Sequence, residues 1–377
     1  MSRKVLVLAN YDSELARRLL DKSTNASQEY EYAFLSGRNY YKDGNLAYQG
    51  NNKSNKLARF IENQRLLNKV NVQTFDIVHI HFLSPTYLFY RKIFKARKVI
   101  VTFWGSDLYR IPKESRLRKF MQREILKHAD AITVVDKKMI KYFHETYGFE
   151  NKPIFVTDLP CLLDFQIIDT LDQQAIELFK ERYQIQRDDI ILTLGYSADP
   201  HKNHEYMINE VLELSKNIKN IFAFLPMTSG NKEYREKIKE YCEETFQKHG
   251  VKYAVLENFM SDQEVAILRK ITDVMVNVQD TDALCASMQE GLYAGSIVIN
   301  GAWLNYDELL ENGAYYETIS EIKPGALSSK LEYVIEHLAD LKERTRINKQ
   351  IIAERNDWNK ARQNFITLYN KLLEDKI

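Results

Sequence analysis

The sequence has little of what secreted, disulfide-bonded or membrane-spanning proteins need. Its 377 residues include only three cysteines, Cys161, Cys242 and Cys285. Their odd number and wide spacing favour reduced structural thiols over a disulfide or zinc framework. No apolar run approaches the roughly 18 residues of a membrane span, and the first residues, MSRKVLVLANYDSE, contain only a short apolar run before polar residues. We therefore expect a cytoplasmic protein without a secretory signal.

An excess of one charge is also lacking, since the net charge is +1. The two halves nevertheless differ: residues 1–150 carry 27 Lys and Arg against 15 Asp and Glu, or +12, and residues 151–377 carry 26 against 37, or −11. In segments 87–98 and 110–127, aromatic and aliphatic residues interleave with Arg and Lys. Such segments can lie on an anionic membrane surface, or form a solvated helix face that packs on the core. No nucleic-acid reader motif accompanies the charge.

Short apolar runs alternate with stretches of helical period along most of the chain, which predicts an α/β fold. Candidate strands in the first half are KVLVLAN (4–10), FDIVHIHF (75–82), KVIVTFW (98–104) and DAITVVD (130–136). Those of the second half are DIILTLGY (189–196), NIFAFLP (220–226), YAVLEN (253–258), VMVNV (274–278) and SIVIN (296–300). The pattern predicts two doubly wound, Rossmann-like domains in tandem. We place them at 1–165 and 166–350, followed by a helical segment, 351–377.

The stretch QDTDALCASMQEGLYAGSIVING (279–301) carries the strongest functional signal. A buried strand precedes it, and a short helix is expected to begin near Ser287. Free amides at such a helix start, those of Ser287, Met288 and Gln289, could hold a diphosphate. The carboxylates of Asp282 and Glu290 could accept hydrogen bonds from sugar hydroxyls. The pair Ser287 and Glu290 is also a capping box, which needs no ligand.

This segment resembles the donor site of GT-B glycosyltransferases, where an acid, a serine five residues later and an acid eight residues later precede a strand. Asp282, Ser287 and Glu290 occupy these positions, although the family usually has Glu where Asp282 stands. The resemblance implies two Rossmann-like domains that face each other across a cleft. It also implies that the C-terminal helix returns to the first domain.

The segment TFWGSDLYR (102–110) ends another predicted strand and offers a second site. Gly105 permits a tight turn, Asp107 offers an acceptor and Arg110 adds a cation. The WGxDLY form is similar to the lipid-linked fucosamine transferase group, and Trp104 stands where many GT-B enzymes have a histidine. Asp107 is therefore our candidate for the acid or base that contacts the acceptor. The alternative is an N-cap or turn aspartate.

The segment LGYSADPHKNHEYMI (194–208) resembles the loop in which retaining GT-B enzymes place Gly-Arg and a downstream Lys-Asn against the donor diphosphate. Lys202 and Asn203 match, and Tyr196 stands where the arginine would be. Further residues are again similar to the fucosamine transferase group: Gly195, Ser197, Asp199, Pro200 and His204. Either Arg110 or His204 replaces the missing cation, or backbone amides and Lys202 stabilise the leaving group.

Two further strand ends of the first domain carry candidate residues. Asn10 and Tyr11 follow the first strand, without the glycines that many GT-B enzymes have there. His79 and His81 lie on one face of their strand by alternation, so we expect at least one to be buried and structural. His81 is the candidate for contact with a ligand or acceptor.

Asp280, Thr281 and Asp282 form a DxD triplet, the pattern by which GT-A glycosyltransferases hold a divalent metal. Because the triplet lies late in a two-domain chain beside the donor motif, we expect no metal site and no cofactor other than the nucleotide-sugar co-substrate. Trp303 and Tyr306 follow, and they either stack on a base or fill the core.

Together these features predict a glycosyltransferase that moves a sugar from a nucleotide-diphosphate donor to a glycan, lipid-linked or protein acceptor in bacterial surface polysaccharide or glycoconjugate synthesis. The candidate catalytic residues are Asp107, Lys202 and Asp282. The candidate donor-binding residues are Gly195, Ser197, Asn203, His204, Ser287, Met288 and Glu290. The candidate acceptor-side residues are Asn10, His81, Trp104, Gly105 and Arg110. The basic first domain would face the acceptor or the inner face of the membrane.

Three other functions fit parts of the pattern: a non-catalytic partner subunit of a glycosyltransferase, a nucleotide-sugar epimerase and a carbohydrate-binding protein. The sequence leaves open the sugar, the base, the acceptor and whether the anomeric configuration is retained or inverted.

Overall fold

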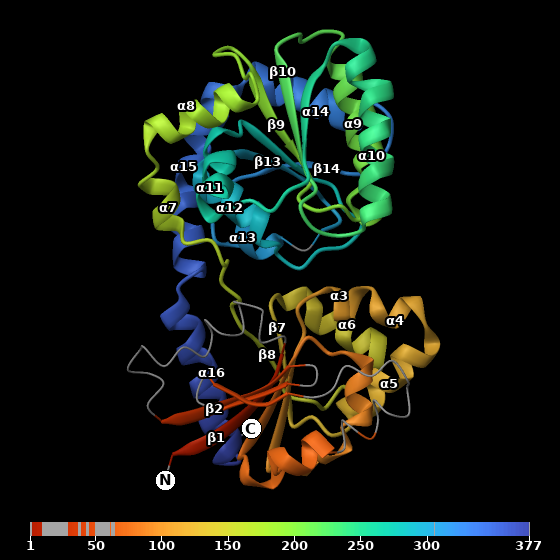
Figure 1. Cartoon of the computed structure of the whole chain (residues 1–377), viewed down its shortest axis with the longest axis vertical. Coiled ribbons are helices and arrows are strands. Elements are labelled where there is room, and N and C mark those ends of the chain that lie inside the picture. Colours follow the sequence, from red (N-terminus) through yellow and green to blue (C-terminus); the bar gives the residue numbers. More distant parts are fainter. Residues whose placement is uncertain are drawn as a thin grey trace. The chain divides into compact units, whose positions relative to one another are not determined.

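The computed structural model describes residues 2–9, 29–36, 39–42, 45–49, 61, 65–304 and 306–376. The chain divides into two compact units (Figure 1), unit 1 with Met1–Pro160 and Asn356–Ile377 and unit 2 with Cys161–Arg355. The divisions fall at 160/161 and 355/356, beside the 165/166 and 350/351 expected from the sequence. Within the described residues, no helix combines the length and apolar character that crossing a membrane requires.

The described part of unit 1 contains an eight-stranded sheet with the order β4-β3-β2-β1-β5-β6-β7-β8. Its parallel strands are β1 (Arg3–Leu8), β2 (Tyr30–Ser36), β5 (Ile77–His81), β6 (Lys98–Thr102), β7 (Ala131–Val134) and β8 (Ile154–Val156). Two antiparallel strands, β3 (Asn39–Lys42) and β4 (Asn45–Gln49), extend one edge. The sequence pattern predicted β1, β5, β6 and β7. It missed β2, β3, β4 and β8. Of these, β3, β4 and β8 are short and at most half-buried, whereas β2 was missed although most of its residues are buried.

Short 3-10 segments and helices connect the strands of unit 1. They are η2 (Val72–Thr74), η3 (Pro85–Phe89), η4 (Arg91–Lys95), α3 (Ser106–Tyr109), α4 (Ile111–Glu114), α5 (Arg116–Leu126) and α6 (Lys137–Tyr147). The last helix of the chain, α16 (Trp358–Leu373), begins after Asp357, whose carboxylate accepts the amide of Asn359 at 2.8 Å. A buried stripe on α16, which includes Phe365 and Tyr369, packs on β1, β5 and β6. The closing segment therefore belongs to the core of unit 1.

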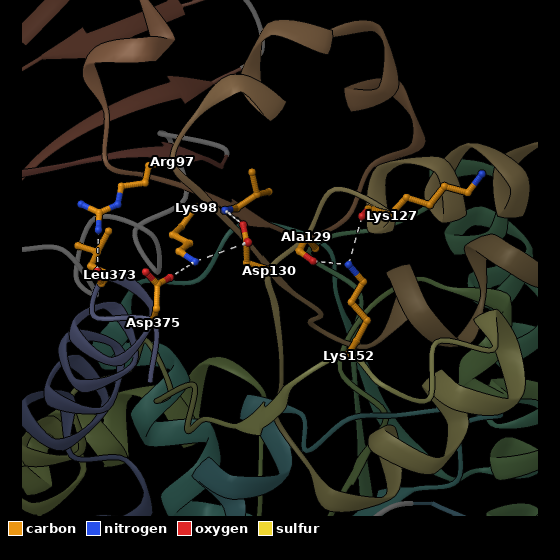
Figure 2. A network of polar contacts seen from close by, with 9 residues as sticks. Arg97, Lys98, Lys127, Ala129, Asp130, Lys152, Leu373 and Asp375 are labelled. Carbon is orange, nitrogen blue, oxygen red and sulfur yellow. Dashed lines mark hydrogen bonds and ion pairs between the residues drawn. The ribbon is translucent and has the colours of Figure 1, made fainter. Parts of the chain in front are cut away.

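A polar network fixes the C-terminal end of α16 at the edge where β6 begins (Figure 2). Arg97 donates to the carbonyl oxygen of Leu373 at 2.8 Å, and the Lys98 ammonium lies 2.7 Å from the Asp375 carboxylate. Lys98 also lies 4.0 Å from Asp130, which accepts the amide of Val99 at 2.7 Å. These contacts join α16 to the amino-terminal ends of the strands, away from their carboxyl ends.

Unit 2 contains a parallel sheet of six strands in its described residues, with the order β11-β10-β9-β12-β13-β14. The strands are β9 (Ile190–Leu194), β10 (Ile221–Pro226), β11 (Lys252–Leu256), β12 (Val274–Asn277), β13 (Ile297–Gly301) and β14 (Glu317–Ile319). All but β14 were predicted from the sequence.

Helices cover both faces of this sheet, as its buried clusters show. They are α7 (Phe165–Asp169), α8 (Gln173–Arg182), η5 (Pro200–Lys202), α9 (His204–Leu214), α10 (Lys232–Thr245), η6 (Gln247–His249), α11 (Asp262–Ile271), α12 (Ala286–Ala294), α13 (Asp307–Glu311), α14 (Ala326–Glu336) and α15 (Leu338–Arg355). Because apolar side chains alternate onto both faces of the strands, each face needs its own helical layer.

Each sheet has one point where the order of the strands reverses. In unit 2 the chain runs outward from β9 through β10 to β11 and then resumes on the other side of β9 with β12. In unit 1 it resumes beside β1 with β5. Ligands of doubly wound sheets bind beyond the carboxyl ends of the strands at such reversals. The loops that follow β9, β12, β1 and β5 are therefore the places to examine.

Candidate functional site

The loop after β9 is shaped by two left-handed residues. Gly195 has a φ of +68°, and a Cβ atom there would lie 2.9 Å from Nε2 of His204. Asn203 has a φ of +61°, and its side-chain amide donates to the carbonyl oxygen of Val278 at 2.8 Å and to Asp280 at 3.0 Å. Asn203 therefore joins the loop after β9 to the loop after β12, and glycine at position 195 leaves the space that His204 occupies.

Lys202 brings a buried positive charge to this point. The residue is 7% exposed, and its ammonium donates to Oε1 of Gln279. The ammonium also lies 3.5 Å from the centre of the Tyr196 ring, whose hydroxyl accepts the Gln279 side-chain amide at 3.0 Å. The tyrosine that stands in the expected arginine position therefore supplies an aromatic face for the Lys202 charge.

His204 does not supply the second cation. Its ring is buried, with Nδ1 at 3.3 Å from the Tyr234 hydroxyl, and its Nε2 has no hydrogen-bond partner among the described residues. Burial, followed by the nearby Lys202 charge, lowers the pKa of His204 to about 3. A neutral imidazole results, so His204 adds no positive charge beside that of Lys202.

Asp282 is oriented by Tyr306. One carboxylate oxygen of Asp282 accepts the Ala283 amide at 2.8 Å, and the other accepts the Tyr306 hydroxyl. The same hydroxyl accepts the Asn277 side chain at 3.2 Å and the Cys285 amide at 3.1 Å. Tyr306 is fully buried, in agreement with the alternative that it fills the core. Burial, and then the nearby Asp282 charge, raise the pKa of Tyr306. This tyrosine, which the sequence did not mark as functional, ties Asp282 to the start of α12.

The start of α12 differs from both expectations for Ser287 and Glu290. The N-cap residue is Cys285, without a side-chain capping bond, so the capping box does not form. The amide of Gln289 donates to the Cys285 carbonyl at 3.3 Å, which corrects its assignment to the anion-binding amides and leaves those of Ser287 and Met288 as candidates.

Glu290 lies inside the helical layer. Its carboxylate accepts a hydrogen bond from Nε of Arg269 at 3.1 Å, and the two side chains are 9% and 6% exposed. Nη1 of Arg269 is buried and has no hydrogen-bond partner among the described residues. Loss of Glu290 would leave a buried arginine without its carboxylate.

The two carboxylates of the DxD triplet have different partners. Asp280 accepts the Asn203 side chain and lies 3.1 Å from Nδ1 of His201, whereas Asp282 accepts Tyr306. Trp303 lies beside this loop, donating from Nε1 to the carbonyl oxygen of Gln279 at 2.8 Å. Ser197, another donor-site candidate, is half-buried, and its carbonyl accepts the Asp199 amide at 2.9 Å.

In unit 1 both strand-end histidines lie on one face of β5, as their alternation predicted. Their ring centres are 4.0 Å apart. His79 is fully buried between the Tyr369 hydroxyl, 2.7 Å from Nδ1, and the Thr102 hydroxyl, 2.6 Å from Nε2. Burial, and then the neighbouring His81, lower the pKa of His79, which is therefore the structural member of the pair.

His81 is held as a neutral ring with a defined tautomer. Nε1 of Trp104 donates to Nδ1 of His81 at 3.4 Å. Tryptophan can only donate, so the proton of the neutral histidine resides on Nε2. Burial lowers the pKa of His81 to about 3. At neutral pH it can offer an N–H donor but no cation.

Asp107 forms the centre of the loop after β6. It has no exposed surface, and it accepts the amides of Leu83 at 2.8 Å, Trp104 at 2.9 Å and Gly105 at 3.0 Å. Burial raises its pKa to about 6, against the lowering effect of these bonds. Gly105 adopts a φ of +127°, which favours glycine. This geometry corresponds to the turn-aspartate alternative, because a carboxylate without exposed surface does not reach an acceptor.

The remaining acceptor-side candidates are Arg110 and Asn10. Arg110 is half-buried between α3 and α4. Asn10 lies outside the described residues. The structure thus brings Gly195, Lys202, Asn203, His204 and Asp282 together in unit 2, and His81, Trp104, Gly105 and Asp107 together in unit 1.

Comparisons with known proteins identify the fold. Residues 25–158, just over a third of the chain, match the family model described as Glycosyltransferase Family 4. No curated protein sequence matches the chain.

Solved structures match nearly the whole chain. A glycosyltransferase from Rickettsia africae ESF-5 is 16% identical with a TM-score of 0.75, over 99% of this chain and 98% of that one. HepE from Anabaena in complex with UDP and glucose is 12% identical with a TM-score of 0.75, over 98% and 100%. Sucrose-phosphate synthase from Thermosynechococcus elongatus is 11% identical with a TM-score of 0.75, over 99% and 100%. These likenesses confirm the predicted α/β fold with two Rossmann-like domains of the GT-B type.

Proposed function

We propose that the chain is a glycosyltransferase that transfers a sugar from a nucleotide-diphosphate donor to a glycan, lipid-linked or protein acceptor in surface polysaccharide or glycoconjugate synthesis. The match to the family 4 model and the GT-B fold support this class of reaction. HepE, a structural neighbour, was solved with UDP and with UDP-glucose, which supports a nucleotide sugar as the partner. The proposal includes contact of unit 1 with the inner face of the membrane.

The observation that carries the proposal is the position of Lys202 at the strand-order reversal of unit 2. Its ammonium lies at the loop after β9, and its charge acts on Cys285, the residue before α12, where it opposes the rise in thiol pKa that burial and Asp282 cause. A cation beside a helix N-terminus favours a diphosphate. Lys202 would therefore stabilise the charge that develops on the leaving nucleotide diphosphate.

The other residues take supporting roles in this proposal. The amides of Ser287 and Met288 would bind phosphate oxygens, and Asp282 would accept hydrogen bonds from the sugar. Asn203 and Glu290 would act by position, Asn203 by joining two loops and Glu290 by fixing α12 to α11 through Arg269. In unit 1, Trp104 and Arg110 would contact the acceptor, and His81, which is 2% exposed, would act through Trp104, which donates to it. Asp107 would hold the backbone of their loop. The reaction would need no metal ion.

A second candidate function is a non-catalytic partner subunit. It is favoured by the tyrosine at position 196 in place of an arginine and by the neutral state of His204, which together reduce the positive charge around the diphosphate. Such a subunit would bind nucleotide weakly or not at all.

The first test is thermal-shift binding with UDP-, GDP- and dTDP-sugars, with and without Mg²⁺. A ligand at 100 times its dissociation constant stabilises the folded state by about 2.7 kcal/mol. We expect one nucleotide class to raise the melting temperature of the wild type without Mg²⁺, and the Lys202→Met variant to lose that shift. Lys248→Met, an exposed lysine of unit 2, is the matched control.

Lys202 is preferred to Glu290 as the test position, because removal of Glu290 would also unpair buried Arg269 and so confuse binding with stability. No shift with any nucleotide would contradict the transferase proposal and favour the partner subunit. A shift accompanied by conversion of the nucleotide sugar without an acceptor would instead indicate an epimerase.

A further inference from the structure

The outward face of α5 carries two large apolar side chains at its centre. Leu117 is 67% exposed and Phe120 is 56% exposed. The inward face of the same helix is formed by Gln122, Ile125 and Leu126. At 3.6 residues per turn, Phe120 points away from that inward face. Packing against the described residues of unit 1 therefore does not account for these two apolar side chains.

Positive side chains surround the two apolar ones. Arg116 precedes Phe120 by four residues, and Arg123 and Lys127 follow it by three and seven, so all three lie on the same side of the helix. From residue 82 to residue 128 the chain contains 12 Lys and Arg against 3 Asp and Glu, or +9. One of the three acids is buried Asp107, and the other two, Glu114 and Glu124, are paired with Arg118 and Lys127. The solvent-facing side of this helix is therefore strongly cationic.

The segments beside α5 extend the same character. η3 packs along α5, and the Phe94 ring of η4 stacks on His128 at 4.6 Å. Arg91 and Lys95 of η4 are exposed, as is about half of Phe89. In Figure 1, α5 lies beside α4 at one side of unit 1. We call Leu117, Phe120 and the cations of α5 and η4 the α5 surface.

We propose that the α5 surface docks unit 1 on an anionic lipid bilayer. Leu117 and Phe120 would enter the boundary between headgroups and acyl chains, while the surrounding Arg and Lys side chains extend their charges toward lipid phosphates. Anionic headgroups complement the charge of +9. A second copy of this surface does not, because pairing two such faces about a two-fold axis would bring like charges together.

Unit 2 offers a contrasting surface of similar exposure. Phe259 is 90% exposed, but it lies between Glu257 and Asp262 in a segment without Lys or Arg. Glu257 pairs with Lys239 at 2.9 Å, so no excess of positive charge surrounds Phe259 to attract an anionic bilayer. Phe259 is therefore the matched control for Phe120, with the same exposed side chain but without the surrounding cations.

The inference rests on the proposed function for its biological purpose, since an enzyme with a lipid-linked acceptor needs the membrane. Its test does not, because vesicle flotation of the full chain contains no nucleotide and no acceptor. Vesicles would be phosphatidylcholine alone, or two parts phosphatidylcholine to one part phosphatidylglycerol, at low and at high ionic strength. Failure of this test and failure of the nucleotide thermal shift can thus be told apart.

We expect the wild type to float with the mixed vesicles at low ionic strength, and to be released by salt. The double variant Leu117→Ser with Phe120→Ser should bind about tenfold more weakly. Arg116→Gln with Arg123→Gln should lose about fivefold for each charge removed. Phe259→Ser and Lys248→Gln should bind as the wild type does. Because all these side chains are exposed, circular dichroism and melting curves should be unchanged.

Three outcomes would overturn the proposal. The first is a wild type that does not float with anionic vesicles at low ionic strength. The second is equal binding by the wild type and the Leu117→Ser, Phe120→Ser variant. The third is a wild type that forms concentration-dependent dimers by light scattering and loses them in that variant, which would assign the α5 surface to contact between copies of the chain.

Discussion

The carboxyl edges of the two sheets carry polar groups in very different states. In unit 1, His79 and Asp107 have no exposed surface, and nearby hydroxyls or backbone amides occupy their polar atoms. In unit 2, the side chains of His201 and Asp280 at the same edge are 45% and 52% exposed, and Lys202 adds a charge. Buried groups whose polar atoms are all bonded within the protein stabilise a loop, whereas exposed polar side chains and the charge of Lys202 remain able to bind a ligand.

This contrast shows that the same residue types at a strand end can stabilise a loop in one unit and bind a ligand in the other. The sequence marked an acid and a histidine in both halves, Asp107 with His81 and Asp282 with His204. Both histidines are buried, but burial separates the acids: Asp107 accepts three backbone amides and has little capacity left for a substrate, whereas Asp282 is only half-buried. The unit 1 cluster should therefore affect stability first, and the unit 2 cluster should affect binding and turnover first.

The largest expected effect is that of Lys202→Met on turnover. Loss of a preorganised charge at a developing diphosphate costs about 100-fold or more. Steady-state kinetics with the nucleotide sugar identified by thermal shift would measure it. The free energy of unfolding should change little, because methionine retains most of the packing on Tyr196. Turnover within a few-fold of that of the Lys248→Met control would break the contrast between the units.

The next effect is a loss of stability on acidification. Burial holds His79 and His81 neutral in the folded protein. On acidification these histidines therefore take up protons in the unfolded chain first. The free energy of unfolding is highest above the pKa of histidine in the unfolded chain, about 6.5, and it falls as the pH drops below that value. Asp107 has the opposite sign: its raised pKa makes stability fall as pH rises from about 4 to about 6.

The two histidines outweigh the single aspartate, so from pH 7 to pH 5 unit 1 should lose about 2 kcal/mol. Urea unfolding at several pH values would measure the loss, and His81→Gln should make the dependence shallower by about one proton. A stability that does not change between pH 7 and pH 5 would show that these histidines are not held neutral.

A slightly smaller effect is expected for Asp107→Asn. In asparagine, one carboxylate oxygen is replaced by an NH2 group, which donates instead of accepting. That group would face a buried backbone N–H, either that of Leu83 or those of Trp104 and Gly105, and the lost hydrogen bond would lower the free energy of unfolding by about 1–3 kcal/mol. The urea midpoint should fall accordingly. Glu114→Gln, an exposed acid of the same unit, should change it by under about 0.5 kcal/mol. An Asp107→Asn variant of normal stability but without activity would restore the catalytic prediction for Asp107.

The smallest effect should follow from Tyr306→Phe, which removes only the hydroxyl that orients Asp282. We expect kcat to fall about tenfold with KM little changed, as for a group that acts in the transition state. Tyr316→Phe is the control, since that buried hydroxyl donates at 3.1 Å to the Tyr306 carbonyl and does not contact Asp282. Equal kinetic losses in both variants would indicate general loosening of the core instead of positioning of Asp282.

Prediction from the sequence succeeded where the signal is local. Long buried strands appear in the sequence as apolar runs between stretches of helical period. The pattern therefore predicted β1, β5, β6 and β7 and five strands of unit 2. Gly105 likewise marked a tight turn, and it has a positive φ. The strands β3, β4 and β8 were missed because strands that are at most half-buried need no apolar pattern, and β2 was missed although most of its residues are buried.

The roles of the polar residues depended on partners far along the chain. Asp107 takes the amide of Leu83, 24 residues away, Glu290 pairs with Arg269, 21 residues away, and His79 bonds Tyr369, 290 residues away. Tyr306 could not be linked to Asp282 from sequence spacing alone. The sequence by itself determined the α/β class, the two-domain order and the loops that carry polar residues, because periodicity and turn chemistry act over a few residues. Only the tertiary structure decided which of those residues form hydrogen bonds within the protein and which remain available to bind a ligand. The reason is that the burial and the partners of a side chain depend on segments that meet only after folding.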